Sequence, residues 1–403
     1  MEGVSAGDST FIRGRMYRTG EPVELVCEGG RILDIHPYPY AATLAGSADN
    51  GALPFIAPGL TDLQINGYAG IDLNSVLLTT KDIARLSLLL LSQGVTAYYP
   101  TVITNGAEAT AALLRSIADA CREDRLAASC IAGIHLEGPF LSPEEGPRGA
   151  HERRFIRPPD WELLQYWQQE ARGLIRIVTL SPEWPEATGF IERCARHGIK
   201  AAIGHTAATP QQIGEAVEAG AVMSTHLGNG AHLTLPRHPN YIWEQLARDQ
   251  LWSCLIADGF HLPDAVLKVI LKVKGHQAVL VSDSVYLAGL KPGEYHTHIG
   301  GDVVLEPGGR LHLKRNAELL AGSARPLPHG IHHLAVSGLA SLADAWEMAS
   351  LRPAAMMGLP GQAGLTAGAP ADVVLFTPGP NGICVHRTYK GGVMVYDRGQ
   401  DNV

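Results

Sequence analysis

Short apolar stretches alternate with longer amphipathic ones in the middle of the chain, between residues 58 and 361. This alternation is typical of the strands and helices of a parallel α/β domain. Eight of the apolar stretches have the length of buried strands and are predicted as such. They cover residues 60–64, 95–101, 131–137, 174–180, 200–205, 221–226, 252–258 and 278–283. Eight strand–helix units favour a closed (β/α)8 barrel over an open sheet.

The helical stretches between these strands carry start and stop signals. Thr209 followed by Pro210 is an N-cap with proline at the first helical position, and Gly220 ends the same helix. Ser341 opens a late helix, with Asp344 three residues further on as in a capping box. These signals support helices between the predicted strands.

Strand-like segments also occur near both ends of the chain, outside the barrel pattern. They are residues 10–13, 23–27, 31–35, 371–376 and 392–396, with Gly or Pro between them. We therefore expect the two ends to pair into one small β-domain made of residues 1–57 and 362–403. The barrel domain then comprises residues 58–361.

Composition narrows the class of protein. Hydrophobic residues make up 46% of the 403 residues and charged residues only 18%, which indicates a folded globular chain. The net charge of -8 gives no support for a nucleic-acid or membrane-surface partner. The six cysteines show no C-x-x-C pair, and the first residues lack a basic segment followed by an apolar one. We expect a cytoplasmic protein without a signal peptide or a membrane span.

Three predicted strands end in residues that bind metals. Glu137 closes the third strand, His205 the fifth and His226 the sixth. A carboxylate at the end of a buried strand is costly unless a cation lies against it. One Glu and two His from separate strands are a ligand set for a divalent metal with an open position, and barrel active sites lie at the C-terminal strand ends. The alternative, a salt-bridged Glu and two core histidines, explains each residue alone better than it explains the three together.

Other polar residues are predicted at the same rim. Asp283 ends the eighth strand and is the natural general base for a metal-activated water, although an N-cap role is the alternative. His151 lies in the long loop after Glu137, where it is either a group that polarises a substrate carbonyl or a surface histidine. His135 shares a strand face with Glu137 and is either a site contact or a structural residue of the barrel interior.

The loops after the sixth and seventh strands hold further candidates. Asn229, Arg237 and His238 lie in a glycine-containing loop after His226 that can hold an anionic or sugar-like ligand. His261 follows the seventh strand, whose last residue is Asp258. A purely structural role is the alternative for His261.

A set of ordered motifs resembles the N-acetylglucosamine-6-phosphate deacetylase family of the amidohydrolase superfamily. The resemblance extends over nearly the whole chain, as far as APADVV at 369–374. The motifs are PGLTDLQING (58–67), HLEGPF (135–140), GHT (204–206), THLxN (225–229), IADGxH (256–261), VxD (281–283) and LAGS (320–323). It implies a TIM barrel with a small β-sandwich from both termini, assembled as a homodimer or higher homo-oligomer.

The resemblance also implies a metal content. Glu137, His205 and His226 would hold one divalent metal ion per subunit, most often Zn²⁺. Many amidohydrolases carry His-x-His after the first strand for a second metal, where this chain has Gln64 and Asn66. Neutral amides are poor ligands for a transition metal, so we expect a single ion.

The implied reaction is hydrolysis of the acetamide of N-acetylglucosamine 6-phosphate to glucosamine 6-phosphate and acetate. Asp283 would take a proton from water and pass it to the leaving amine, while His151 stabilises the oxyanion. Arg237 would hold the phosphate, in its own subunit or in a neighbour's. The substrate contacts carried over from the family are Ala150, His151, Asn229, Gly230, Arg237, His261, Leu320, Ala321 and Gly322.

The sequence departs from the family pattern in these substrate contacts. The loop that usually reads HL(Y/F)NAM is HLGNGA at 226–231, and RxPG is RHPN at 237–240. The mostly apolar family segment after LAGS becomes ARPLPH at 324–329. Two alternatives therefore stay open: a metal hydrolase for another N-acyl or cyclic amide, and a non-catalytic binding protein on the same fold. Cyclic-amide enzymes typically use two metals bridged by a carboxylated lysine, and residues 174–180 contain no lysine.

Overall fold

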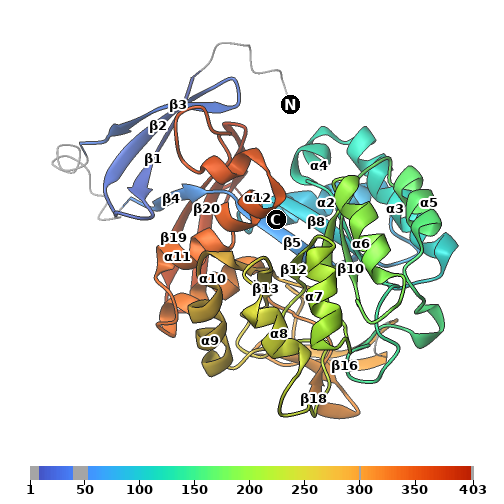
Figure 1. Ribbon diagram of the computed structural model, residues 1–403. Coiled ribbons are helices and arrows are strands. Elements are labelled where there is room, and N and C mark those ends of the chain that lie inside the picture. Colours follow the sequence, from blue (N-terminus) through green and yellow to red (C-terminus); the bar gives the residue numbers. More distant parts are fainter. Residues whose placement is uncertain (1–8, 40–52, 299–300, 401–403) are drawn as a thin grey trace.

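The computed structural model describes residues 9–39, 53–298 and 301–400 (Figure 1). The segment on which the expected lack of a signal peptide rests, residues 1–8, lies outside these ranges. Within them, no helix is long and apolar enough to cross a membrane.

The eight predicted strands form one parallel sheet that curls into a barrel, as expected. In chain order they are β5 (Leu60–Ile65), β8 (Val95–Ile103), β9 (Ile134–Glu137), β10 (Ile175–Leu180), β11 (Lys200–Ile203), β12 (Ala221–Ser224), β13 (Trp252–Leu255) and β14 (Ala278–Leu280). Each pairs with the next, from β5 to β14. The seam between β14 and β5 closes through an isolated bridge between Ile65 and Ser284 and a 2.9 Å bond from Asp283 N to Gln64 O.

Several strands end earlier than the apolar pattern predicts. β11 and β12 stop two residues before His205 and His226, and β14 stops three residues before Asp283. These three residues have φ values of 49°, 24° and 47°. A positive φ takes the backbone out of the extended conformation, so the hydrogen-bonded ladder ends before the polar residue.

Helices surround the barrel, as Figure 1 shows. The predicted caps are present: Thr209 accepts a bond from Gln212 N, and Ser341 accepts one from Asp344 N. The helices are α2 (Thr80–Leu91), α3 (Ala107–Glu123), α4 (Arg125–Cys130), α5 (Trp161–Glu170), α6 (Ala187–Arg196), α7 (Pro210–Glu218), α8 (Tyr241–Ala247), α9 (Asp264–Lys274), α10 (Leu327–Val336), α11 (Leu342–Met348) and α12 (Leu351–Met357).

Both ends of the chain contribute to one seven-stranded sheet, as predicted. Its order is β21-β20-β19-β4-β1-β2-β3, with β4 and β19 joining the two ends in antiparallel register. The strands are β1 (Thr10–Met16), β2 (Pro22–Glu28), β3 (Arg31–Pro37), β4 (Phe55–Pro58), β19 (Val373–Gly379), β20 (Gly382–Lys390) and β21 (Val393–Asp397). Trp346 of α11 links this sheet to the barrel, because its ring stacks on Phe376 at 4.0 Å and its Nε1 donates to Pro58 O at 2.9 Å.

A four-stranded antiparallel sheet after β14 is an addition that the sequence pattern did not predict. It consists of β15 (Gly293–Thr297), β16 (Gly301–Leu305), β17 (Leu311–Leu313) and β18 (Asn316–Leu320). Its labelled strands β16 and β18 lie at the opposite end of the molecule from β1–β3 in Figure 1. A small core of its own, including Leu287, Val303 and Ala324, anchors it to the chain that follows β14. A two-stranded ribbon, β6 (Gly67–Tyr68) and β7 (Ile71–Asp72), follows β5.

Candidate metal and catalytic site

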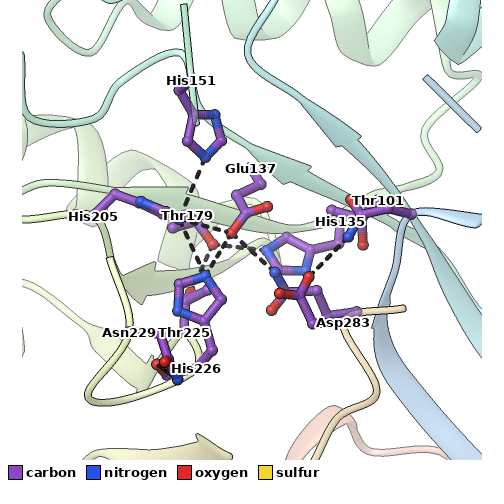
Figure 2. Close-up of polar contacts among 12 residues, drawn as sticks. Thr101, His135, Glu137, His151, Thr179, His205, Thr225, His226, Asn229 and Asp283 are labelled. Carbon is purple, nitrogen blue, oxygen red and sulfur yellow. Dashed lines mark hydrogen bonds and ion pairs between the residues drawn. The ribbon is translucent and has the colours of Figure 1, made fainter. Parts of the chain in front are cut away.

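The three predicted metal ligands meet inside the rim of the barrel. Glu137 Oε1 lies 3.2 Å from His205 Nε2 and 3.0 Å from His226 Nε2, and the two Nε2 atoms are 3.1 Å apart. All three residues are buried, and they form a compact group of potential ligand atoms (Figure 2). The structure thus brings together residues that are far apart in the sequence.

The bonding of this group fits a cation. His205 Nδ1 lies 2.8 Å from the carbonyl oxygen of Pro147, which can only accept, so Nδ1 carries the proton and Nε2 of the neutral ring presents a lone pair. Burial raises the pKa of Glu137, but the two imidazoles outweigh it and keep that pKa well below its ordinary value. An ionised carboxylate and imidazole lone pairs about 3 Å apart are a nitrogen and oxygen ligand set that suits Zn²⁺ and similar ions.

Glycine makes room for the tight approach of a loop to His205. A Cβ at Gly230 would lie 2.6 Å from His205 Nδ1, and the residue has a φ of 56°. A side chain at this position would therefore displace the imidazole. Gly230 was predicted as a substrate contact, and the structure also gives it this steric role beside the ring.

Gln64 and Asn66 hold the two carboxylates of the site. Gln64 Nε2 donates to Glu137 Oε1 at 2.9 Å, and Asn66 Nδ2 donates to Asp283 Oδ1 at 2.8 Å. Each amide thus donates a hydrogen bond to a carboxylate from the position where other amidohydrolases have a histidine ligand. This arrangement agrees with the single metal ion expected from the sequence.

Asp283 lies beside the trio, across the closing seam from Asn66. Burial raises the pKa of Asp283 to about 6, and the negative charge of Glu137 adds to the effect. Its Oδ1 is taken by Asn66. A carboxylate whose proton affinity has been raised toward neutral pH is suited to accept a proton and return it.

His151 is buried against the same group, and Thr104 restrains it. His151 Nε2 is 3.3 Å from His205 Nε2, and its Nδ1 is 2.9 Å from Thr104 Oγ1. In the neutral tautomer with its proton on Nε2, His151 turns that N–H toward the ligand group. Its Nδ1 then accepts from the Thr104 hydroxyl. Burial lowers the pKa of His151 to about 3, so the ring is a neutral donor through Nε2.

A buried polar chain runs below the ligands. His135 Nδ1 is 3.0 Å from Leu63 O, its Nε2 is 2.7 Å from Thr179 Oγ1, and Thr179 is 2.7 Å from Thr225 Oγ1. This network of side chains links four barrel strands beside Glu137 and His226 (Figure 2). The sequence did not single out Thr104, Thr179 or Thr225, because threonine at a strand end is common and carries no distinctive signal.

The structure places the remaining predicted contacts around this centre. Asn229 donates to His226 O at 3.2 Å, and His261 Nδ1 is 2.7 Å from Asp258 Oδ2. Ala150 is exposed. Leu320 is the last residue of β18, and the segment with Ala321 and Gly322 that follows it reaches the rim, because Ser323 bridges to Ser284.

Arg237 does not join the cluster. Its side chain is exposed, and it makes no ion pair with any carboxylate of the described ranges. The resemblance implies that Arg237 binds phosphate, but no ion pair within the described part of the subunit holds its side chain in place for this role.

Comparisons with known proteins agree with this geometry. The Amidohydrolase family model matches residues 55–395. N-acetylglucosamine-6-phosphate deacetylase of Bacillus subtilis (strain 168) is 35% identical over 84% of this chain and 83% of its own length. N-acetylgalactosamine-6-phosphate deacetylase of Escherichia coli O157:H7 is 29% identical over 87% of this chain and 89% of its own. The crystal structure of N-acetyl-D-glucosamine-6-phosphate deacetylase from Mycobacterium smegmatis has a TM-score of 0.82 at 26% identity and covers 96% of this chain and 100% of that one.

The fold and the site define a (β/α)8-barrel protein with a buried Glu–His–His ligand set and an adjacent aspartate. The chain belongs to the amidohydrolase family, whose model covers most of its length. The resemblance inferred from the ordered motifs is confirmed at the level of this family.

Removal of a ligand tests the metal site. We expect His226→Ala to lower the bound metal, measured by elemental analysis, from one ion per subunit to well under half. Zn²⁺ at 100 times its dissociation constant adds about 2.7 kcal/mol to the stability of a protein that binds it only when folded. The wild type should therefore gain thermal stability on adding Zn²⁺, and His226→Ala should not.

The matched control is His36→Ala, which removes an exposed histidine of β3. It should keep both the metal and the thermal shift. Full metal content in His226→Ala would show that the Glu137–His205–His226 group is not the binding site.

Proposed function

We propose that this enzyme hydrolyses the acetamide of N-acetylglucosamine 6-phosphate, releasing glucosamine 6-phosphate and acetate. The observation that carries the proposal is the convergence of Glu137, His205 and His226 beside Asp283. The family membership and the identity to deacetylases over most of the chain support hydrolysis of an N-acetyl group.

One divalent ion per subunit, which we propose is Zn²⁺, would be held by Glu137, His205 and His226. When bound, such an ion supplies Lewis-acid chemistry, lowering the pKa of water and polarising a carbonyl oxygen. We also propose that the enzyme works in the cytoplasm as a homodimer or higher homo-oligomer on a small amino-sugar phosphate, as the sequence suggests.

Asp283 moves the proton in this scheme. Its Oδ1 is fixed by Asn66, which leaves Oδ2 to accept a proton from the attacking water. The same carboxyl then gives this proton to the amide nitrogen as the C–N bond breaks and the amine leaves. The ordinary pKa of an aspartate would make it a poor acid in the second step, and its raised pKa of about 6 brings it within reach of both.

His151 assists at the carbonyl. With Nδ1 facing the Thr104 hydroxyl, its Nε2–H donates to the carbonyl oxygen as negative charge develops on it. Because the ring stays neutral, it donates without adding a positive charge that would compete with a bound cation. Gln64 keeps Glu137 in place on the other side of the group.

The altered loops are expected to change which substrate binds more than which reaction is catalysed. The ligand set and the base keep the family residues, whereas the departures lie at 226–231, 237–240 and 324–329. The absence of a lysine from β10, which reads IRIVTL, disfavours the two-metal cyclic-amide branch. If the enzyme does not turn over the sugar phosphate, we expect its substrate to be a different N-acyl compound.

Asp283→Asn tests the base. We expect it to keep its metal and to lose at least about 100-fold in kcat, because general acid–base catalysis contributes roughly 100- to 10,000-fold. Acetate release and elemental analysis measure the two effects. Asp264→Asn, which changes a carboxylate at the start of α9, is the control and should behave like the wild type. Unchanged turnover in Asp283→Asn would remove Asp283 as the base.

Thr104→Val tests the tautomer of His151. Valine keeps the shape of threonine without the hydroxyl, so His151 loses the donor to its Nδ1. We expect kcat/KM to fall roughly 10- to 100-fold, as for other partners that orient a catalytic histidine. Thr104→Ser should restore most of the rate, and the metal content should be the same in all three proteins. Equal rates for the valine variant and the wild type would contradict the role.

The substrate is tested by acetate release from N-acetylglucosamine 6-phosphate and from unphosphorylated N-acetylglucosamine with metal-loaded enzyme. We expect kcat/KM for the phosphorylated sugar to be at least about 100-fold higher, a difference of about 2.7 kcal/mol. The galactosamine isomer is run in parallel, because one relative is a deacetylase for that sugar phosphate. No turnover of any of them by a metal-loaded protein would move the assignment to another amide.

A further inference from the structure

The chain reaches the rim a second time after the inserted four-stranded sheet. Ser323 forms a parallel bridge with Ser284, the residue after Asp283, and accepts a bond from Val285 N at 2.9 Å. Two residues later the chain places Arg325. A charged residue thus follows closely on the segment that bridges to the strand end carrying Asp283.

Arg325 is half-buried and lacks an anionic partner. Its Nη2 donates to Gly308 O in the turn between β16 and β17, but its Nε is buried without a hydrogen-bond partner. None of the ion pairs among the described residues includes it. Burial lowers its pKa. Removing part of a guanidinium from water without an anionic partner is unfavourable. An anionic ligand would compensate this cost at Arg325.

The neighbours of Arg325 do not neutralise it. Asp258 is near enough for its charge to act on Arg325, but its oxygens already accept bonds from Phe260 N, His261 N and His261 Nδ1. His329, four residues further on, is partly buried, and burial lowers its pKa to about 4, which leaves it neutral. Within residues 320–329, Arg325 is therefore the residue with a permanent positive charge.

We propose that Arg325 binds an anionic group of the substrate, namely a phosphate monoester, and so determines specificity at this site. The proposal rests on the proposed function, since it assigns the phosphate of the amino-sugar substrate to a residue next to strand eight. A guanidinium offers several N–H donors in one planar fork, a geometry that matches two phosphate oxygens at once. Arg237, the residue that the family resemblance assigns to this task, is exposed and lies on another loop.

The test replaces Arg325 and compares two sugars. Arg325→Leu restores the apolar character of the family segment, and Arg325→Lys keeps the charge but not the planar fork. We expect Arg325→Leu to raise KM for N-acetylglucosamine 6-phosphate at least about 10-fold with little change in kcat, because a lost charge-assisted pair weakens ground-state and transition-state binding alike. Turnover of unphosphorylated N-acetylglucosamine should stay as in the wild type. Arg325→Lys should lie between the two.

The matched control is Arg310→Gln, which removes another partly buried arginine of the same inserted sheet that already pairs with Glu306. It should leave both sugars unaffected. If Arg325→Leu lowers the rates with both sugars equally, or leaves the preference for the phosphorylated sugar intact, Arg325 has a structural role only and the proposal is wrong.

A second measurement separates this proposal from the proposed function. Inorganic phosphate should raise the thermal unfolding temperature of the metal-loaded wild type and of Arg310→Gln, and should not raise that of Arg325→Leu. If the wild type hydrolyses none of the sugars, the deacetylase assignment fails while the phosphate shift still reports on Arg325. A shift of equal size in Arg325→Leu overturns the anion site whatever the substrate proves to be.

Discussion

The buried carboxylate of Glu137 is the constraint on which the site depends. Leaving an ionised group at the end of an interior strand is unfavourable unless cations and donors surround it. Here the Gln64 amide donates to the carboxylate, and His205 and His226 complete with it a ligand set for a cation, each from a different strand end. Because these partners come from β5 and from the turns after β11 and β12, they can meet only when the barrel is closed. The residues that surround the charge of Glu137 can therefore do so only in the complete barrel fold.

Much of this arrangement is readable from the chain. Runs of apolar residues that end in Glu or His predict both the strands and the three residues that converge at the rim, because buried strands and metal sites each favour particular residue types. The caps at Thr209 and Ser341 are local signals, so they too are predictable. The strand limits are less so: the positive φ values of His205 and His226 end the ladder earlier than hydrophobicity alone indicates.

Other features depend on contacts that only the folded chain defines. The strand β18, with the sequence NAELL, is mostly exposed and contains no β-branched or aromatic residue, so pairing with β17 decides its conformation. The hydroxyls of Thr104, Thr179 and Thr225 become informative only once their partners are known. The same is true of Arg325, whose charge is unremarkable in sequence and becomes significant because its Nε is buried without a partner.

The barrel closes where Ile65 bridges Ser284, and this seam holds Asp283 against Asn66. Backbone bonds run across it from Asp283 N to Gln64 O and from Asn66 N and Gly67 N to Ser284 O, so it is made by the segments just beyond the strand ladder. The group that we propose for proton transfer thus sits at this joint, and its alignment is set by how the cylinder is joined. Engineering this enzyme for heat resistance by tightening the seam would retune catalysis at the same time, because the two properties share the same few atoms.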